Sequence, residues 1–418
     1  MLVFHVDVNS AYLSWTAVEM LKNGSGRDIR KENAVIGGDP TSRTGIVLAK
    51  SQIAKNRGVI TGEPLCRARK KSPGLEVFPP DFDLYFRSSQ KMVEFMHQYS
   101  NRIERYSIDE CFVEMDIRVS DREFAVETAT ELKDRIEAQL GFTVNVGVST
   151  NKFLAKMAGE LRKPNMVHTL FPDEIPDKLW PLPVGEMFMV GRATEQKLKQ
   201  IGIDTIGKLA ATDRSSLVAL LKKTGITLWE YANGIDHSKV EYEKEQRCKS
   251  IGHSTTTKVD VVNFRDAQLI MFALCEKTCM RLRKQKSKAK VVGVRLRNSR
   301  LENVTKQMTL PRETDSTDTI YQAGSQLLKE IWSGEAVRQI GIFVSKFDNQ
   351  QEQLSIFDAA PSEGEPGIIE EMEAKEHARD EAIDKIREKF GEKAIIRGCF
   401  VGSDTEPIIG KGSGLKFL

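Results

Sequence analysis

The sequence predicts a multi-domain protein of the α+β class, and three observations support this prediction. The chain has 418 residues, which is too many for one ordinary core and suggests two to four domains. Strand-like and helix-like patterns alternate in two separate stretches, 78–167 and 246–347. Between them, residues 172–240 combine helical periodicity with short loops.

The composition is typical of a globular protein and argues against several other classes. Apolar residues make up 40% of the chain and charged residues 29%. No apolar run approaches the roughly 20 residues that a membrane helix needs, and the chain opens on LVFHVDV without the features of a leader. The six cysteines show no CxxC pair and no zinc spacing. We therefore expect a cytoplasmic protein without disulfides, structural zinc or a membrane contact.

The first α+β unit alternates strands and helices around a strand at 2–9. The next helix, 10–24, has apolar residues at helical spacing until Asn23-Gly24 ends it. The strand at 2–9 would join the later elements through a discontinuous chain path, because the stretch up to about 77 forms short, basic pieces of its own. Those later elements are a helix at 83–103, a strand pair around SIDECFVEM, a helix at 121–140, the strand TVNVGVS and a helix at 150–162.

The second α+β unit is strongly basic, whereas the segment after it is acidic. Residues 244–346 contain 20 Lys and Arg against 10 Asp and Glu, and residues 347–395 contain 6 against 14. The first segment suits a polyanion and the second repels one. The elements expected in the basic unit are helices near 263–284 and 317–332 and the strands KVVGVRLRN, VTKQMTL and QIGIFVSKF.

The end of the chain divides into a linker and a helix. The stretch 348–367 is polar and acidic and contains Pro361 and Pro366, as is typical of a mobile linker. An amphipathic helix is expected over 368–390. Its apolar residues fit packing on the body of the protein or on a partner, and the sequence does not choose between the two.

Three carboxylates are candidate metal ligands. Strand alternation in LVFHVDV places Val3, His5 and Asp7 on one face, where an ionised aspartate is costly to bury without a cation or a donor. Asp109 and Glu110 lie together at an expected hairpin turn. Such a set suits two hard cations, which prefer oxygen ligands completed by substrate phosphates. The spacing alone favours another interpretation, in which Asp7 is a capping residue and Asp109-Glu110 is a solvated turn, and only the other motifs shift the balance toward a metal site.

Three strings carry a resemblance to a known family: DVNSAY at 7–12, YSIDE at 106–110 and GVSTNKFLAKMAGELRKPN at 147–165. The sequence resembles the Y-family translesion DNA polymerases of the DinB and UmuC type, the impB/mucB/samB family, over about residues 1–347. The resemblance implies a right-hand polymerase fold with five parts. These are a palm at 1–9 and 78–167, fingers at 10–77, a small helical thumb at 168–240, a little finger at 246–347, and a linker with a clamp-binding motif and a helix at 348–418.

The resemblance also assigns roles to residues near the carboxylates. It makes Asp7, Asp109 and Glu110 the catalytic ligands of two Mg²⁺ ions, with Mn²⁺ as an alternative, and it adds Val8 to the metal ligands. Tyr12 matches the family's steric gate, whose ring would clash with a ribose 2′ hydroxyl.

The helix within 147–165 supplies cations close to this site. Lys163 matches the family's triphosphate-contacting lysine. Lys152 and Lys156 are expected to point outward at i, i+4 spacing, and they would either help gather a nucleotide or form a solvated basic face.

The segment 43–59 departs from the family pattern. Where the DinB type has threonine, tyrosine and arginine, this chain has Ala49, Gln52 and Lys55, and Ala11 stands where an aromatic is common. Lys55 can neutralise a phosphate, but it lacks the bidentate fork of arginine. The departures leave lesion preference and nucleotide affinity open.

Two segments are candidates for holding primer–template DNA. Residues 182–210 fit a helix-hairpin-helix, with turns at Gly191 and Gly202 whose main-chain amides can hold a phosphate. Arg295 and Arg297 alternate with apolar residues in RLRKQKSKAKVVGVRLRNSR, so that one strand face can follow the DNA backbone.

The tail contains a pattern that resembles a sliding-clamp-binding peptide. In it, Gln353 would hydrogen-bond and Leu354 and Phe357 would fill an apolar pocket on the clamp. The expected protein is a monomeric, low-fidelity polymerase without proofreading. Its rivals are a DNA- and clamp-binding factor that has lost catalysis, and a nucleotidyl cyclase-like enzyme built on a similar two-metal palm.

Overall fold

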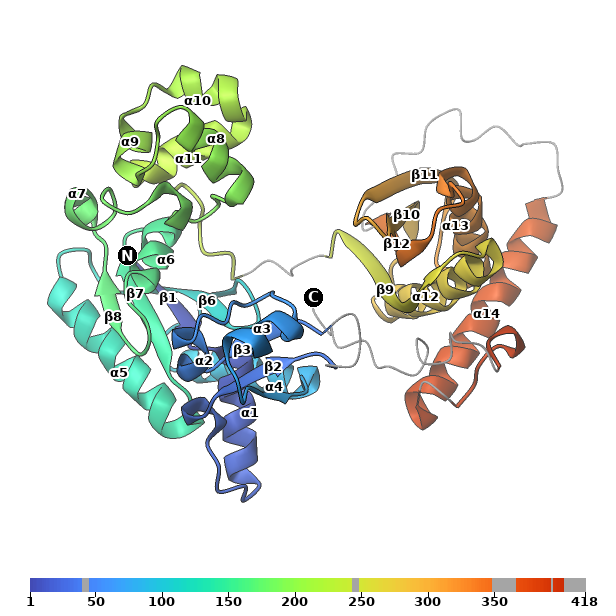
Figure 1. Cartoon of the computed structure of the whole chain (residues 1–418), viewed down its shortest axis with the longest axis horizontal. Coiled ribbons are helices and arrows are strands. Elements are labelled where there is room, and N and C mark those ends of the chain that lie inside the picture. The colour runs from blue at the N-terminus through green and yellow to red at the C-terminus, as the bar shows by residue number, and fades with distance from the viewer. Residues whose placement is uncertain (40–44, 243–247, 348–365, 392–393, 402–418) are drawn as a thin grey trace. The chain divides into compact units, whose positions relative to one another are not determined.

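The chain forms two compact units, the first from Met1–Pro40 and Gly45–Glu245 and the second mainly from Gln246–Leu418 (Figure 1). The structure is a computed structural model that describes residues 1–39, 45–242, 248–347, 366–391 and 394–401, with side chains of the last long helix described from 375 onward. Among these residues, no helix has the length and apolar character that crossing a bilayer requires.

The first unit is built on a five-stranded sheet with the order β5-β6-β1-β7-β8. The amino-terminal strand β1 lies at its centre and pairs antiparallel with both β6 and β7. Residues far apart in the sequence therefore meet at the first strand, as the discontinuous chain path predicts. The strands are β1 Leu2–Val8, β5 Ile103–Arg105, β6 Glu110–Met115, β7 Val144–Ser149 and β8 Val167–Thr169.

The strand register determines which residues share a face of this sheet. Asp7 lies opposite Glu110 on β6 and opposite Asn145 on β7. Because directly paired residues point to the same side, these three side chains share one face. The alternate residues of β1 point to the other side of the sheet, where Phe4 is fully buried. The alternation predicted for LVFHVDV is thus confirmed.

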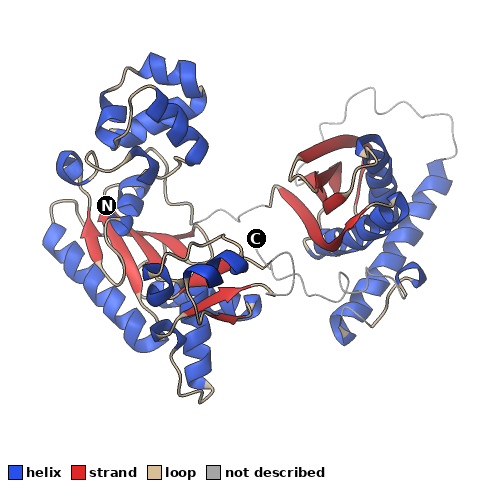
Figure 2. Ribbon diagram, viewed as in Figure 1, coloured by secondary structure: helices blue, strands red, loops and turns tan. Residues whose placement is uncertain are grey.

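Helices pack on this sheet (Figure 2), and the contacts at Gly147 show that one of them approaches it very closely. α5, Arg122–Leu140, packs against β7, and α6, Lys152–Glu160, packs against β1 and β7. A Cβ atom at Gly147 would lie only 2.0 Å from the carbonyl oxygen of Ala155 in α6. Only glycine at this position lets α6 lie directly on the face that carries Asp7.

A smaller three-stranded sheet, with the order β3-β2-β4, belongs to the same unit. The strand β4 of this sheet ends at Phe78. The second predicted palm segment, 78–167, therefore begins with a residue that belongs to the smaller sheet. The helix predicted at 83–103 ends at Met96, because the chain must turn before β5 begins. The elements are α1 Ala11–Lys22, η1 Ile29–Lys31, β2 Ala34–Gly37, β3 Val47–Lys50, α2 Gln52–Asn56, α3 Leu65–Lys71, β4 Glu76–Phe78 and α4 Phe82–Met96.

A group of short helices around one apolar cluster follows β8. Leu198, Ile206 and Leu209 are fully buried in it. The same cluster includes Phe153 and Leu154 of α6, so the helical group packs onto the half of the unit that contains the five-stranded sheet. The helices are η2 Pro172–Glu174, α7 Ile175–Lys178, η3 Val184–Glu186, α8 Arg192–Gln200, α9 Ile206–Ala211, α10 Arg214–Leu221 and α11 Lys223–Ala232.

The second unit packs two long helices against a four-stranded antiparallel sheet with the order β11-β10-β12-β9. The sequence analysis missed the edge strand β9, because only Ile251 and Val261 of its residues are buried and the apolar pattern is weak. The other strands and both helices were predicted. The elements are β9 Ser250–Val261, α12 Phe264–Lys284, β10 Ala289–Asn298, β11 Asn303–Thr314, α13 Thr317–Ile331 and β12 Val337–Phe347.

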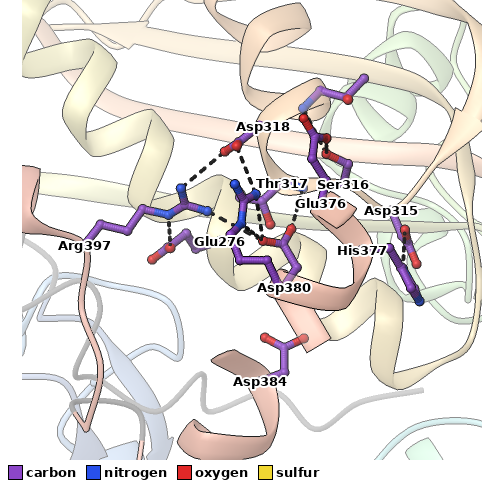
Figure 3. Close-up of polar contacts among 12 residues, drawn as sticks. Glu276, Asp315, Ser316, Thr317, Asp318, Glu376, His377, Asp380, Asp384 and Arg397 are labelled. Atoms are coloured by element: carbon purple, nitrogen blue, oxygen red, sulfur yellow. Dashed lines mark hydrogen bonds and ion pairs between the residues drawn. The ribbon is translucent and has the colours of Figure 1, made fainter. Parts of the chain in front are cut away.

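The last long helix, α14 Pro366–Phe390, packs on this second unit, which answers the question that its sequence left open. Asp380 is a central contact, since it accepts a hydrogen bond of 3.0 Å from the main-chain N–H of Thr317 at the start of α13 (Figure 3). Asp380 also pairs with the buried Arg283 of α12 at 3.2 Å, and Asp384 pairs with the same arginine at 2.7 Å. The helix is therefore held mainly by charged groups.

The segment after α14 extends this contact. Glu276 of α12 is buried and pairs with Arg387 at 3.1 Å and with Arg397 at 2.7 Å. Phe400, in the short helix η4 Gly398–Phe400, is fully buried beside Phe272. The described part of the C-terminal segment thus adds a further layer to the helices of the second unit.

Replacing Glu276 with alanine should destabilise the second unit by about 3 kcal/mol or more. The change leaves the buried Arg387 without its partner, and an uncompensated buried charge is costly. Calorimetric unfolding of the full chain measures the effect. The matched control is Lys284→Ala on the same helix, which breaks an exposed pair with Glu388 at 3.7 Å and should change stability by less than about 0.5 kcal/mol. An equal loss of stability in the two variants would show that the buried pair stabilises the unit no more than the exposed pair does.

Candidate active site

The three predicted carboxylates come together at one end of the central sheet. Asp7 and Glu110 are cross-strand partners, and Asp109 precedes Glu110 in the turn before β6. The main-chain N–H of Val8 donates to the carbonyl oxygen of Asp109 at 3.0 Å, which fixes that turn against β1. Ser107 closes the turn, since its hydroxyl donates to Asp109 Oδ1 at 2.7 Å and accepts from the Glu110 N–H at 3.1 Å.

Two lysines reach into this acidic cluster. Lys163 Nζ donates to Asp7 Oδ2 at 2.6 Å and to Glu160 at 2.7 Å. Lys156 Nζ contacts Glu110 Oε2 and is buried. The prediction that Lys156 points outward is therefore wrong. α6 lies so close to the sheet that the face carrying this lysine is turned toward Glu110.

The outward orientation predicted for Lys152 is also wrong. Its ammonium pairs with Glu104 of β5 at 2.7 Å, and both side chains are largely buried. Glu104 also accepts a hydrogen bond of 2.9 Å from the main-chain N–H of Glu241. This ion pair fastens the chain segment that leaves the first unit, and it does not contact the three carboxylates.

The donor set fits hard divalent cations. Each carboxylate has one oxygen bonded to a protein donor: Asp7 Oδ2, Asp109 Oδ1 and Glu110 Oε2. Its second oxygen accepts no hydrogen bond from any other residue that the structure describes. Within the same residues, no group of three or more His, Cys, Asp or Glu side chains is placed so that it could hold a metal ion. A magnesium ion commonly binds to only one or two carboxylates, and waters and substrate phosphates complete its shell.

The three acids differ in their proton affinity. Burial raises the pKa of Asp7 to about 6, even though Lys163 opposes the shift. Burial also raises the pKa of Asp109, against the hydrogen bond from Ser107. Burial acts in the same direction on Glu110, but contacts with His5 and Lys156 outweigh it and lower the pKa of Glu110 to about 2. Without a metal, burial therefore outweighs the compensating contacts at Asp7 and Asp109, and the reverse holds at Glu110.

An asparagine network positions Lys163. Asn145, fully buried on β7, donates to the carbonyl oxygens of Gly159 at 3.1 Å and Arg162 at 2.7 Å. Asn9 donates to Asn145 at 3.0 Å and accepts from the main-chain N–H of Asn165 at 2.9 Å. These bonds tie both sides of the turn that carries Lys163 to β1 and β7.

Tyr12 lies on the first turn of α1, next to the carboxylates. Its ring stacks on Tyr85 with centroids 4.4 Å apart and meets Phe82 edge-on at 6.1 Å. Burial raises the pKa of its hydroxyl, and the nearby charge of Asp109 adds to that shift. The ring is therefore held rigidly, half-buried, near a metal-ligand candidate.

The segment that departs from the family pattern lies on β3 and α2. Lys55 is exposed, and no contact among the described residues joins it to the three carboxylates. Gln52 donates to Asn56 at 2.8 Å, and Ala49 is buried. The structure therefore places Lys55 on the surface of the smaller sheet's helices, and its contact with a nucleotide stays a prediction.

The predicted DNA contacts belong to two units. Gly191 is the N-cap of α8, and Gly202 adopts a φ of 82° after that helix, so both occupy turns as predicted. In the second unit Arg295 is exposed on β10, while Val294 and Leu296 on either side are buried. The predicted clamp-binding residues Gln353, Leu354 and Phe357 lie outside the described residues.

The other predicted arginine, Arg297, donates to Asn303 at 2.9 Å across to β11. The guanidinium of Arg295 donates to the hydroxyl of Thr305, which also lies on β11, at 3.4 Å. The strand face that the alternation predicted is thus formed by polar and basic side chains.

Sequence reasoning missed one residue of the site, His5. This side chain is fully buried, and its Nε2 lies 3.2 Å from Glu110 Oε2. For Lys156, the sequence allowed a role in gathering a nucleotide or a place on a solvated face, but it did not predict the contact with Glu110. The signal for His5 was present, because the strand alternation places it on the face of Asp7. Nothing in the sequence shows how close α6 lies to β7.

Family models match most of the chain. The impB/mucB/samB family model matches residues 6–160, and the model of its C-terminal domain matches residues 248–356. The chain belongs to the impB/mucB/samB family. The predicted membership of the Y family of DinB type is thereby confirmed. Between the two regions, the family's HHH motif matches residues 172–203, and a DNA polymerase-iota thumb model matches residues 189–236.

Curated relatives of this chain bear the name DNA polymerase IV. The protein of that name from Clostridium acetobutylicum is 44% identical over 97% of this chain and 99% of its own length. DNA polymerase IV 1 of Bacillus subtilis is 34% identical over 100% of this chain and 97% of its own length.

Solved structures share the fold. A Y-family DNA polymerase chimera of Dbh and Dpo4 has a TM-score of 0.71 at 23% identity, covering 82% of this chain and 98% of its own. An insertion ternary complex of Dbh DNA polymerase covers the same shares at 22% identity with a TM-score of 0.56. The predicted multi-domain α+β polymerase fold is confirmed.

In metal-free buffer, Asp7→Asn and Glu110→Gln should change stability in opposite directions. The pKa of Asp7 is about 6 when folded against 3.8 when unfolded, so ionisation costs stability as the pH rises through this interval. Asparagine removes that cost and should stabilise the protein at pH 8 by about 1–3 kcal/mol.

Ionisation of Glu110 affects stability in the opposite direction, because the pKa of this carboxyl falls from 4.5 to about 2 on folding. Its ionised form stabilises the fold above pH 4.5, and this contribution is lost as the pH falls toward 2. Glu110→Gln should therefore lower the melting temperature at pH 8, as measured by thermal unfolding in EDTA. A shift of both variants in the same direction would rule out this account of the site.

Proposed function

We propose that the chain is a translesion DNA polymerase that extends a primer opposite damaged template by a two-metal mechanism. The observation that carries the proposal is the meeting of Asp7, Asp109 and Glu110 at one end of the sheet, in a member of the impB/mucB/samB family. The reaction joins the primer 3′ oxygen to the α-phosphorus of a deoxynucleoside triphosphate and releases pyrophosphate.

The three carboxylates and the main chain at Val8 would hold two Mg²⁺ ions, or Mn²⁺. Two such ions, when bound, stabilise negative charge on both the attacking and the leaving oxygens. The oxygens of Asp7, Asp109 and Glu110 without protein donors support this role. The raised pKa of Asp7 supports it as well, since a nearby cation would compensate this buried charge.

Lys163 is the proposed contact for the triphosphate. It holds its ammonium between Asp7 and Glu160, so a cation is already in place beside the carboxylates. Lys55 would add a second, weaker phosphate contact from α2. Tyr12 would select the sugar, because a ring fixed by Tyr85 and Phe82 cannot yield to a 2′ hydroxyl.

Two other parts of the chain would bind the primer–template DNA. Main-chain amides near Gly191 and Gly202 and the side chains of Arg295 and Arg297 would contact DNA phosphates. The palm would comprise residues 1–9 and 78–167, the fingers 10–77, the thumb 168–240 and the little finger 246–347.

The tail from Gln353 to Phe357 would bind a sliding clamp. We further propose low fidelity, no proofreading, a role in SOS-type damage tolerance, a monomeric state and a cytoplasmic location. Each of these rests on the family resemblance.

The two rival functions fit the site less well. A DNA-binding factor without catalysis has no need of three carboxylates gathered on one face. A nucleotidyl cyclase has no use for the family's HHH motif at residues 172–203 or for the basic C-terminal domain. Cyclic nucleotide formation without DNA would favour the second rival.

The double variant Asp109→Ala, Glu110→Ala should lose primer extension on a template with an abasic site. The two changes remove metal ligands and leave the DNA contacts in place. Primer extension with Mg²⁺ and a DNA-binding assay on the same preparations test this. Extension that survives in the variant would refute the metal site. Intact DNA binding without extension by the native chain would favour the non-catalytic factor.

Tyr12→Ala should raise ribonucleotide incorporation by about 10- to 200-fold, the range that one removed steric contact provides. Single-nucleotide insertion of the matched rNTP and dNTP measures it. Tyr12→Phe is the control, because it keeps the ring and should keep the discrimination. Equal discrimination by the alanine and phenylalanine variants would show that Tyr12 is only a core aromatic.

A further inference from the structure

Glu110 is held on one side of its carboxylate by two donors. His5 Nε2 lies 3.2 Å from Oε2, and Lys156 Nζ contacts the same oxygen. The other oxygen, Oε1, accepts no hydrogen bond from the part of the chain that the structure describes. The two oxygens of one carboxylate thus have different surroundings, and rotation of the group would break both contacts.

Lys156 is confined by aromatic rings. Its Nζ lies 5.4 Å from the ring centre of Tyr106 and 5.2 Å from that of Phe188, and these two rings meet edge-on at 6.1 Å. A cation over aromatic faces and away from water interacts strongly with its carboxylate. Phe188 follows η3 in the helical group, and its main-chain N–H contacts Met157 Sδ at 3.4 Å. The ammonium is thereby fixed from the side of the helical group.

His5 is fixed from the side of the sheet. Its ring is fully buried, lies 5.0 Å from Phe112 and has Gly159 of α6 beside it. A Cβ at Gly159 would lie 3.1 Å from His5 Nδ1, so a side chain there would push the ring by a few tenths of an ångström. Nδ1 has no hydrogen-bond partner among the described residues, so Nε2 is the ring nitrogen that forms a hydrogen bond, with Glu110.

We infer that Lys156 and His5 are positioning residues that hold Glu110 Oε2, so that Glu110 offers Oε1 alone to a metal ion. The inference rests on the proposed function, in which Glu110 is a metal ligand. It adds that residues of α6 and β1 would set the orientation of the Glu110 carboxylate toward the ion. Partners that orient a metal ligand commonly contribute about 10- to 100-fold to metal affinity or activity.

Lys152 provides a matched control one helical turn earlier. Its pair with Glu104 is similarly buried and comes from the same helix, but it fastens the segment at Glu241 and does not touch Glu110. A purely structural role for Lys156 would make the two lysines equivalent. A positioning role separates them.

The experiment compares Lys156→Met, Lys156→Arg and Lys152→Met. Single-nucleotide insertion gives kcat and KM. Mn²⁺ affinity is measured on the complex with dideoxy-terminated primer–template and dNTP, and thermal unfolding and DNA binding are measured alongside. Lys156→Met should lower kcat and Mn²⁺ affinity by about 10- to 100-fold each, with a smaller change in KM and unchanged DNA binding. Lys152→Met should lower only the melting temperature.

Lys156→Arg should recover most of the lost affinity, because it keeps a cationic donor. Room for the larger group exists in a cavity of about 440 Å³ that Lys156 lines together with Met157, Leu182 and Phe188. If Lys156→Met does not fold, His5→Phe replaces it, since phenylalanine keeps an aromatic ring and removes the donor. His5→Phe should weaken Mn²⁺ binding in the same range.

Folded variants that bind Mn²⁺ and turn over like the native chain would overturn the inference. Glu110→Ala separates this failure from failure of the proposed function. If Glu110→Ala is inactive while Lys156→Met is normal, only the positioning role fails. If Glu110→Ala extends primers normally, the metal site itself is wrong.

Discussion

The antiparallel pairing of β1 with both β6 and β7 is the constraint on which the site depends. It places Asp7 opposite Glu110 on one side and opposite Asn145 on the other. A shift of one residue in either pairing would send one partner to the opposite face of the sheet. The candidate metal-binding carboxylates and the asparagine that supports Lys163 would then no longer share a surface.

The close approach of α6 adds the second requirement. Gly147 and Gly159 remove the side chains that would keep this helix away from the sheet. At this distance Lys156 reaches Glu110, while Lys163 reaches Asp7 from the turn beyond the helix. The site therefore gathers its charges in pairs, and the lysines partly compensate carboxylates that burial would otherwise favour as neutral acids.

Much of this arrangement could be predicted from the sequence, and the limits have physical causes. The strand alternation around Asp7 and the family strings identified the three carboxylates. The orientation of Lys156 could not be predicted, because a lysine at i, i+4 from another lysine is typical of a solvated face and only the packing of α6 shows otherwise. Strand β9 was missed because an edge strand buries few residues. The docking of α14 depends on charge pairs with α12 and α13, which amphipathicity alone does not reveal.

That docking lowers the positive charge on one side of the second unit. The acidic helix α14 lies against the helices of a segment with twice as many basic as acidic residues, and its carboxylates neutralise Arg283 there. The strand surface with Arg295 keeps its positive charge. The docked helix therefore lowers the positive charge that the helical side offers to a polyanion, and the strand side keeps the stronger attraction.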